Sequence, residues 1–374
     1  MKWHLTALPS GSSRTLIAGL AGLGLVGVGV WWTLRGPTET GGPESSGSPA
    51  RTQSATRAGD DRSDRAQRDA AMRGHVTLSE AVAMCDRWDI PRLTREQIET
   101  YLNQRGRTTS SLLAAANLIE GPELLIEAAK QSPSDPRVLL ALALQGNGNL
   151  SRQAALDAFR AAAPDNALGD YLHSLAAFNS GRPDDALAGL AEATAKPGFE
   201  SFSHDTRDEM ERMFRSSGFS PQAARVVAMF RDSQAGNLAL AGLGKHLGGE
   251  IARALRRNDD ARAVALAQQG LVLADRIRRT DTLLARMAAT TQELAVLGTL
   301  PPATVIEPGG PTAGERLDQC RNTSVEIENL ASMAGHLADI PAGDAERYYD
   351  LAWQEGEFQA ARWLKAKLAG TDAR

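Results

Sequence analysis

Helix start and stop signals recur along this chain from about residue 75 to its end. Three segments have the form of a capping box, in which a threonine and a glutamate or glutamine three residues later cap each other's backbone; they begin at Thr77, Thr94 and Thr206. Prolines suited to a first helical turn and glycines suited to a helix end flank apolar stretches with helical spacing. These residues are Pro122, Pro136, Pro183, Pro221, Gly106, Gly121, Gly146, Gly181, Gly218 and Gly356. Because 62 Ala and 45 Leu stand among the 374 residues, we predict an all-α fold without strands.

One apolar run near the N-terminus is long enough to cross a membrane. Residues 15–34 carry no charge. At about 1.5 Å per residue they would span roughly 30 Å as a helix. Trp31 and Trp32 stand at one end of the run, where amphipathic rings favour the membrane interface. We predict a single transmembrane helix over residues 15–34, preceded by a short N-terminal segment, residues 1–14.

A cleaved signal peptide is the alternative reading of this run. Its apolar core is usually about 7–15 residues and precedes an Ala-x-Ala cleavage site. The run here is longer and ends in Trp-Trp-Thr-Leu-Arg. An uncleaved anchor is therefore favoured. Lys2, Arg14 and the α-amino group precede it, which favours a cytoplasmic N-terminus and an extracytoplasmic, periplasmic body.

The segment after the predicted anchor has the composition of a disordered linker. Residues 36–71 contain no Val, Ile, Leu, Met, Phe, Trp, Tyr or Cys. Such a segment cannot bury enough apolar area to offset the entropy lost on ordering. We predict a disordered linker over residues 36–74.

The stretch from Pro164 to Pro197 predicts two helices of similar length around a Gly-Arg-Pro turn at residues 181–183. Small residues stand at Ser174, Ala186 and Ala193, where they allow close helix contact. This pattern resembles the tetratricopeptide repeat (TPR), and weaker copies surround it. We therefore expect a TPR-like α-solenoid over residues 76–258. In that family the first helix of each repeat lines a concave surface that binds peptides, which points to Tyr171 and Asn179 as groove candidates.

The C-terminal part departs from the repeat pattern. Residues 259–297 predict one very long helix, or two helices broken near Thr280. A Pro/Gly loop at 298–311 precedes a second long helix over 314–340, and a helical hairpin covers 348–368. We expect an antiparallel long-helix pair plus a C-terminal capping hairpin over residues 259–374.

No enzyme motif was found along the chain. The segment 239–246 lacks the first Gly and the final Ser or Thr of a phosphate-binding loop. The six His are scattered without helical pairing, so neither a metal site nor a cofactor is predicted. Two separate buried thiols are expected at Cys85 and Cys320. A formal net charge of −4 does not favour nucleic-acid binding.

One segment is basic although the chain as a whole has a negative net charge. Residues 245–286 hold nine cations and five acids. A basic patch at Arg253, Arg256, Arg257 and Arg262 could meet anionic lipid or an acidic partner. A solvated helix face with local ion pairs is the alternative.

These features predict a membrane-anchored helical-repeat scaffold or adaptor that binds protein or peptide partners near the membrane, in envelope assembly or secretion. The layout resembles that of bacterial single-span proteins with extracytoplasmic TPR domains. Two alternatives remain open. One is an all-helical lyase or hydrolase with an unrecognised site, and the other is a structural protein that self-associates as a homo-oligomer.

Overall fold

The computed structural model describes residues 75–87, 89–119, 121–146, 151–232, 235–280, 282–334 and 337–370, which belong to a single compact unit of the chain. The predicted N-terminal segment, membrane anchor (15–34) and linker (36–74) lie outside the described residues. Within the described ranges, no helix combines the length and the apolar character that crossing a bilayer requires.

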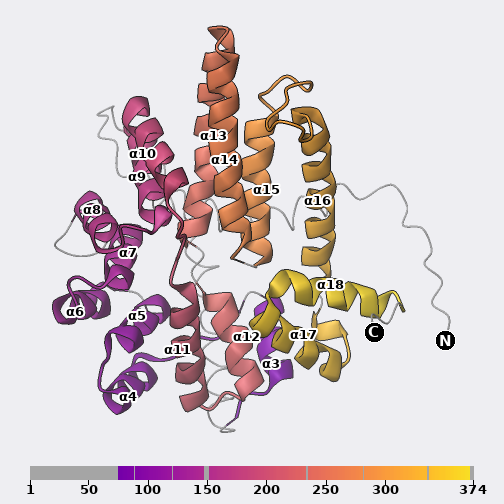
Figure 1. The fold of residues 1–374 in the computed structure, drawn as a ribbon. Helices are drawn as coiled ribbons and strands as arrows, with labels where there is room; N and C mark the ends of the chain where they lie inside the picture. Colours follow the sequence, from indigo (N-terminus) through magenta and orange to yellow (C-terminus); the bar gives the residue numbers. More distant parts are fainter. Residues whose placement is uncertain are drawn as a thin grey trace, which may run out of the picture. The chain divides into compact units, whose positions relative to one another are not determined.

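The described residues form α-helices throughout, which confirms the all-α prediction (Figure 1). Their backbone pairing of β type is limited to isolated bridges, such as Val76 with Phe219 and Asn166 with Gly198. The helices are α3 (Leu78–Asp86), α4 (Arg95–Arg105), α5 (Thr109–Leu118), α6 (Glu123–Gln131), α7 (Pro136–Gln145), α8 (Arg152–Ala162), α9 (Ala167–Asn179), α10 (Pro183–Ala195), α11 (Ser203–Ser216), α12 (Pro221–Arg231), α13 (Ala235–Arg256), α14 (Asp260–Arg278), α15 (Leu283–Leu297), α16 (Ala313–Ala334), α17 (Ala342–Glu355) and α18 (Glu357–Leu368).

Most of the predicted helix boundaries are confirmed. Thr77 and Thr94 cap α3 and α4 in full capping boxes, and prolines occupy the first turns of α7, α10 and α12. The predicted terminal glycines all have positive φ, the conformation that glycine adopts without strain. The predicted capping box at Thr206 is not formed. Helix α11 already begins at Ser203, so Thr206 lies inside the helix, where its hydroxyl donates to the Phe202 carbonyl at 3.3 Å.

Neighbouring helices pack as hairpins, an arrangement compatible with a helical repeat. The pairs are α5–α6, α7–α8, α9–α10, α11–α12 and α17–α18. In the α9–α10 pair, a Cβ built on Gly189 would lie only 2.8 Å from the Ser174 hydroxyl oxygen. Small residues at these positions therefore let the two helices approach closely.

The hairpins do not stack in a simple sequential order. Helix α12 packs on α3, and α11 packs on α5. The Val76 N–H donates to the Gly218 carbonyl at 2.9 Å, and the Ser220 N–H donates back to the Val76 carbonyl at 2.9 Å. Arg231 donates to the Ile90 carbonyl at 2.6 Å. The first described helix is thus held against a hairpin far along the sequence, unlike in an open solenoid.

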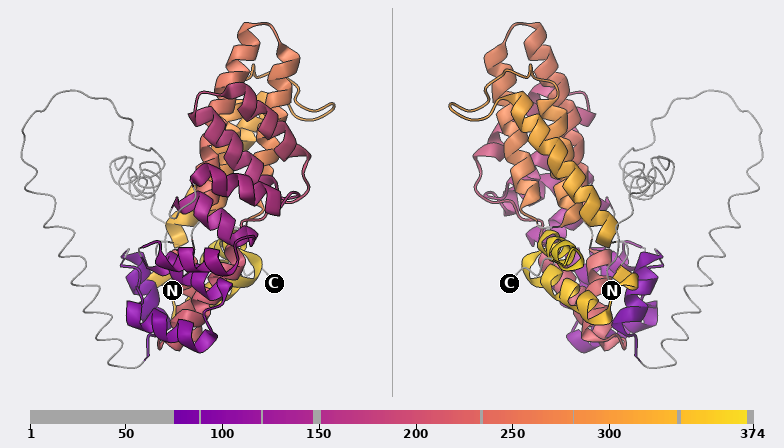
Figure 2. Two further views of the ribbon diagram at one scale, coloured as in Figure 1. Left: turned by 90° about the vertical axis from the view of Figure 1, so that its left-hand side faces the viewer. Right: turned by 90° about the vertical axis from the view of Figure 1, so that its right-hand side faces the viewer.

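The C-terminal part forms a helical bundle rather than the predicted pair of long helices. Helices α13, α14 and α15 pack against one another, and α16 packs on α15 (Figures 1 and 2). Residues 259–297 form two helices with a break at 279–282, which was one of the two expectations for this segment. The predicted helix over 314–340 ends earlier, at Ala334. The C-terminal hairpin packs on α12 and α16.

Close backbone contact joins α13 to α15 in this bundle. A Cβ on Gly244 would lie 2.6 Å from Gln292 Oε1, and one on Gly248 would lie 2.9 Å from the Ala295 carbonyl oxygen. The two glycines are one helical turn apart, so they form a small-residue face along α13. Both helices also contribute to one of the two apolar cores, which holds the buried Cys320, whereas Cys85 lies in the other.

Candidate functional site

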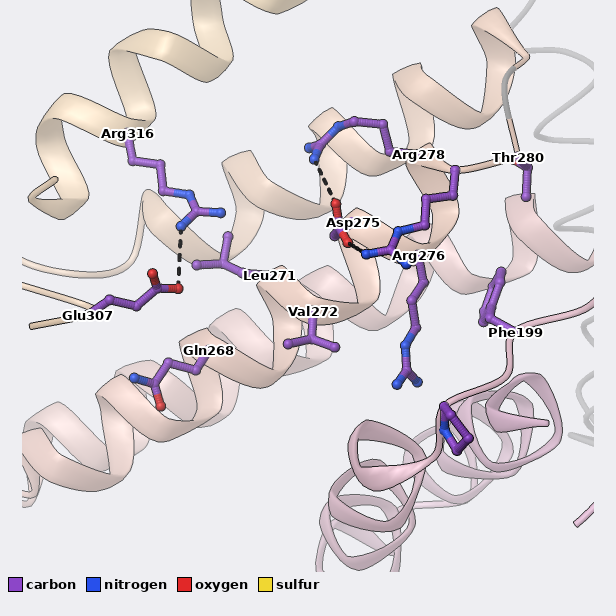
Figure 3. Close-up of a pocket in the computed structure, with 12 residues that line it drawn as sticks. Phe199, Gln268, Leu271, Val272, Asp275, Arg276, Arg278, Thr280, Glu307 and Arg316 are labelled. Carbon is purple, nitrogen blue, oxygen red and sulfur yellow. Dashed lines mark hydrogen bonds and ion pairs between the residues drawn. The ribbon is translucent and has the colours of Figure 1, made fainter. Parts of the chain in front are cut away.

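A cavity of about 760 Å³ opens along α14, between the segment at 197–199, the loop after α15 and the beginning of α16 (Figure 3). Most of its lining is polar, and arginine is its commonest residue. The lining residues are Pro197, Phe199, Gln268, Leu271, Val272, Asp275, Arg276, Arg278, Arg279, Thr280, Glu307 and Arg316.

Helical spacing explains why α14 supplies most of this lining. Gln268, Val272 and Arg276 are each four residues apart, so their side chains follow one another along one face of the helix. The arginines cluster near the C-terminal end of α14. Positive side chains are favoured there, because the helix dipole places partial negative charge at that end.

Arg276 links α14 to the C-terminal end of α10. Its Nη1 donates to the Ala193 carbonyl at 2.7 Å and to the Tyr171 hydroxyl at 3.2 Å. Its Nη2 donates to the Thr194 carbonyl at 3.1 Å and to the Lys196 carbonyl. These carbonyls lie at the end of α10, where helix backbone acceptors lack intrahelical partners.

Within the described part of the chain, the positive charge of Arg276 faces these dipoles and the Tyr171 ring, whose centroid lies 5.6 Å from its guanidinium carbon. None of the carboxylates described there forms an ion pair with Arg276. The nearby buried Asp170 is instead paired with Arg160, at 2.6 Å, and with Lys196. Arg276 therefore contributes a positive charge to the cavity wall without a neutralising carboxylate.

A buried carboxylate fixes the opposite wall. Glu293 of α15 is only 5% exposed, and its Oε2 accepts from Arg278 Nη2 at 2.6 Å and from Cys320 Sγ at 3.3 Å. Burial, reinforced by the charge and the hydrogen bond of Glu293, raises the pKa of the Cys320 thiol to about 12. Arg316 Nη2 lies 3.8 Å from Glu293 Oε1. This cluster joins α14, α15 and α16 behind the cavity.

The ion pairs at the rim of the cavity are exposed to solvent. Arg279 Nη2 lies 2.7 Å from Asp275 Oδ2, and the two side chains are 77% and 51% exposed. Arg316 Nη1 lies 3.9 Å from Glu307 Oε1, beyond hydrogen-bond distance. Exposed ion pairs contribute little to stability, so a ligand carboxylate can compete for these arginines at small cost.

An exposed apolar surface lies between the two charged ends. Val272 is 36% exposed, and Leu271 beside it is buried (Figure 3). Gln268 donates to the Ile306 carbonyl at 2.7 Å, which holds the loop after α15 against α14. The cavity therefore combines an apolar centre with arginines at both ends.

The two predicted groove residues occupy different environments. Tyr171 has no exposed surface; its ring contacts that of Phe199 edge-on, with centroids 6.1 Å apart, and its hydroxyl accepts from Arg276. It supports the cavity from behind and offers no surface to a partner. Asn179 is exposed, and its Oδ1 lies 3.3 Å from His246 Nε2.

The predicted basic patch lies at the junction of α13 and α14, separate from the cavity lining. All four of its arginines are exposed: Arg253, Arg256, Arg257 and Arg262. Arg253 pairs with Glu250 at 2.6 Å, whereas the other three form no ion pair within the described ranges. Arg276, Arg278 and Arg279 belong to the wider basic segment of the sequence, residues 245–286, but no sequence pattern joins them to Phe199, Glu307 and Arg316.

Comparisons of the chain with protein-family models, curated proteins and solved structures found no match. The described His, Cys, Asp and Glu residues include no group of three or more that could hold a metal ion. The cavity is therefore interpreted from its own geometry and charge.

Proposed function

We propose that this chain is a membrane-anchored helical scaffold or adaptor, built from degenerate TPR-like hairpins, that binds a protein or peptide partner in the cavity along α14. The observation that carries the proposal is this cavity, whose exposed Val272 lies between arginines from α14 and α16. Its volume falls within the range of about 300–1,000 Å³ typical of ligand pockets. Apolar contact supplies affinity in such sites, and a few charged groups supply orientation.

In this proposal, the predicted anchor and linker hold the helical body close to the membrane. A flexible linker over residues 36–74 spans roughly 30–36 Å root-mean-square. Attachment through residues 15–34 confines the helical body near the bilayer and raises its effective concentration for membrane-bound partners. We place the body on the extracytoplasmic side, where its partners belong to envelope assembly or secretion.

Site-specific crosslinking of the full-length chain in its native membrane tests this function. A photo-crosslinking side chain replaces Val272 in the cavity. In the control variant it replaces Val325, which is 57% exposed on α16 and does not line the cavity. Captured proteins are identified by mass spectrometry. We expect a partner that is captured from position 272 and not from position 325.

Two results would contradict the proposal. Equal capture from both positions would mean that the cavity has no role in binding. Capture of a second copy of this chain alone, from position 272, would replace the adaptor with a self-associating structural protein.

A further inference from the structure

We infer that the partner enters this cavity as an extended acidic peptide segment, with two carboxylates four residues apart and an apolar side chain midway between them on the same face. The inference rests on the proposed function and specifies the chemistry of the bound segment. It follows from three properties of the cavity, namely its length, its charge and its apolar centre.

The length follows from α14. Arg316 and Gln268 lie toward one end of the cavity and Arg276 toward the other, with Val272 between them along the helix (Figure 3). The eight-residue step from Gln268 to Arg276 corresponds to about 12 Å of helix at about 1.5 Å per residue. An extended peptide covers that distance with about four residues at about 3.3 Å each, and side chains four residues apart point to the same face.

The charge favours carboxylates at both ends. The lining carries four arginines and two acids. Arg276 has no carboxylate partner within the described ranges, and the two ion pairs of Arg316, at 3.8 and 3.9 Å, are too long for hydrogen bonds. Arginine binds carboxylates in a planar, two-point arrangement. Arg316 has donors free for such a contact at one end. Arg276 already donates both hydrogens of each Nη to α10 and Tyr171, so at its end the contact falls to Arg279, whose ion pair with Asp275 is exposed.

An acidic ligand has to replace the two acids of the lining, Asp275 and Glu307, as the partners of Arg279 and Arg316. Asp275 is 51% exposed and Glu307 is 64% exposed. They repel an acidic ligand and also compete with it for Arg279 and Arg316. Because both side chains reach solvent, they can turn away, and removing either charge should strengthen binding.

The apolar centre selects the middle of the segment. Val272 is exposed beside the buried Leu271, and Phe199 also lines the cavity. A leucine or valine between the two carboxylates would cover Val272 and exclude water from it. Burial of apolar area then adds to the charge contacts.

Binding of a fluorescein-labelled peptide Gly-Glu-Ser-Leu-Ser-Glu-Gly, whose glutamates and leucine share one face of an extended chain, to the purified full-length chain in lipid nanodiscs tests the inference by fluorescence anisotropy. The control peptide carries glutamine in place of both glutamates. We expect the acidic peptide alone to bind, more weakly at higher salt. Arg316→Gln and Arg279→Gln should each raise its Kd by about tenfold. Arg321→Gln, on an exposed arginine of α16 that pairs with Asp318, should leave the Kd unchanged.

The Asp275→Asn variant separates an effect on binding from misfolding, because a misfolded protein would bind the peptide more weakly and not more tightly. We expect this variant to lower the Kd several-fold. Equal binding of the glutamine peptide, or equal weakening by Arg321→Gln, would overturn the inference. Failure of the acidic peptide while position 272 still captures a partner would overturn the acidic chemistry and leave the proposed function standing. Failure of both would contradict both.

Discussion

Arg276 Nη1 lies 2.7 Å from the carbonyl oxygen of Ala193, so a side chain of α14 closes the C-terminal end of α10. Replacing Arg276 with methionine keeps much of the apolar stem but removes its hydrogen bonds to the carbonyls of Ala193, Thr194 and Lys196. Within the described residues, only the Ala193 carbonyl has a second donor among the backbone contacts outside the helices, the Lys196 N–H at 3.2 Å. Hydrogen bonds to charged groups contribute about 1.5–3 kcal/mol each, and losses within one network are not additive. We expect Arg276→Met to lower the free energy of unfolding by about 3 kcal/mol.

Urea unfolding followed by circular dichroism measures this loss. Arg279→Met is the matched control, because the Arg279 side chain is 77% exposed and, among the described residues, pairs with Asp275 alone. That variant should change the free energy of unfolding by less than about 1 kcal/mol. Similar losses in the two variants would contradict the capping role of Arg276.

Adjacent glycines of α13 should respond to substitution in opposite directions. A Cβ on Gly248 would lie 2.9 Å from the Ala295 carbonyl oxygen, whereas one on Gly249 would meet nothing within 4 Å. Gly248→Ala should destabilise the protein by about 1–3 kcal/mol through overpacking. Gly249→Ala should stabilise it by up to about 1 kcal/mol, because alanine favours helix. Thermal denaturation of the two variants measures both changes in stability. Stabilisation by both would show that α13 and α15 can separate freely.

The imidazole of His246 makes stability depend on pH. Its ring stacks on Phe178 with centroids 4.9 Å apart and an interplanar angle of 5°. Burial, followed by repulsion from Lys245, lowers the pKa of His246 below its ordinary value of 6.5. Below pH 6.5, His246 binds more protons in the unfolded chain than in the folded chain. Its contribution to the free energy of unfolding is therefore lost as the pH falls from 6.5 through the lower pKa of the folded state.

His246→Gln should therefore flatten the fall in stability between pH 7 and pH 5. Urea midpoints across this range measure the effect. His75→Gln, on an exposed histidine, should keep the wild-type slope. An unchanged slope in His246→Gln would contradict the stacking role of the neutral ring.

Both cysteines should resist modification in the folded protein. Cys85 is 1% exposed and Cys320 is 6% exposed, and the high pKa of Cys320 keeps it protonated at neutral pH. With a thiol reagent at pH 8 we expect no fast reaction under native conditions and two reactive thiols in denaturant without reductant. No thiols in denaturant would mean that the two cysteines are oxidised.

Local signals carried much of the fold prediction. The capping threonines, first-turn prolines and terminal glycines act within about five residues, so the sequence alone indicates where most helices begin and end. Pro122 and Thr206 are exceptions, since Pro122 is the N-cap residue of α6 and not a first-turn residue. Thr206–Glu209 fits the pattern of a helix start, but α11 begins three residues earlier, at Ser203.

Long-range packing left no comparable signal. The Tyr101 hydroxyl donates to the buried Glu209 at 2.8 Å, across 108 positions of sequence. Neither residue differs locally from an ordinary helix residue. The cavity could be predicted only in part for the same reason. The α14 face of Gln268, Val272 and Arg276 follows from helical spacing, whereas Phe199 and Arg316 reach it through tertiary packing.

The attachment of α3 to α12 also sets an order of events during synthesis. Arg231 donates to the Ile90 carbonyl 141 positions earlier, so the first described helix completes its packing only after α12 has left the ribosome. At about 5–20 residues per second this takes roughly 7–28 s. During that interval the apolar face of α3, which includes Val82 and Cys85, lacks its packing against α12, and such transiently exposed apolar surface is prone to aggregation.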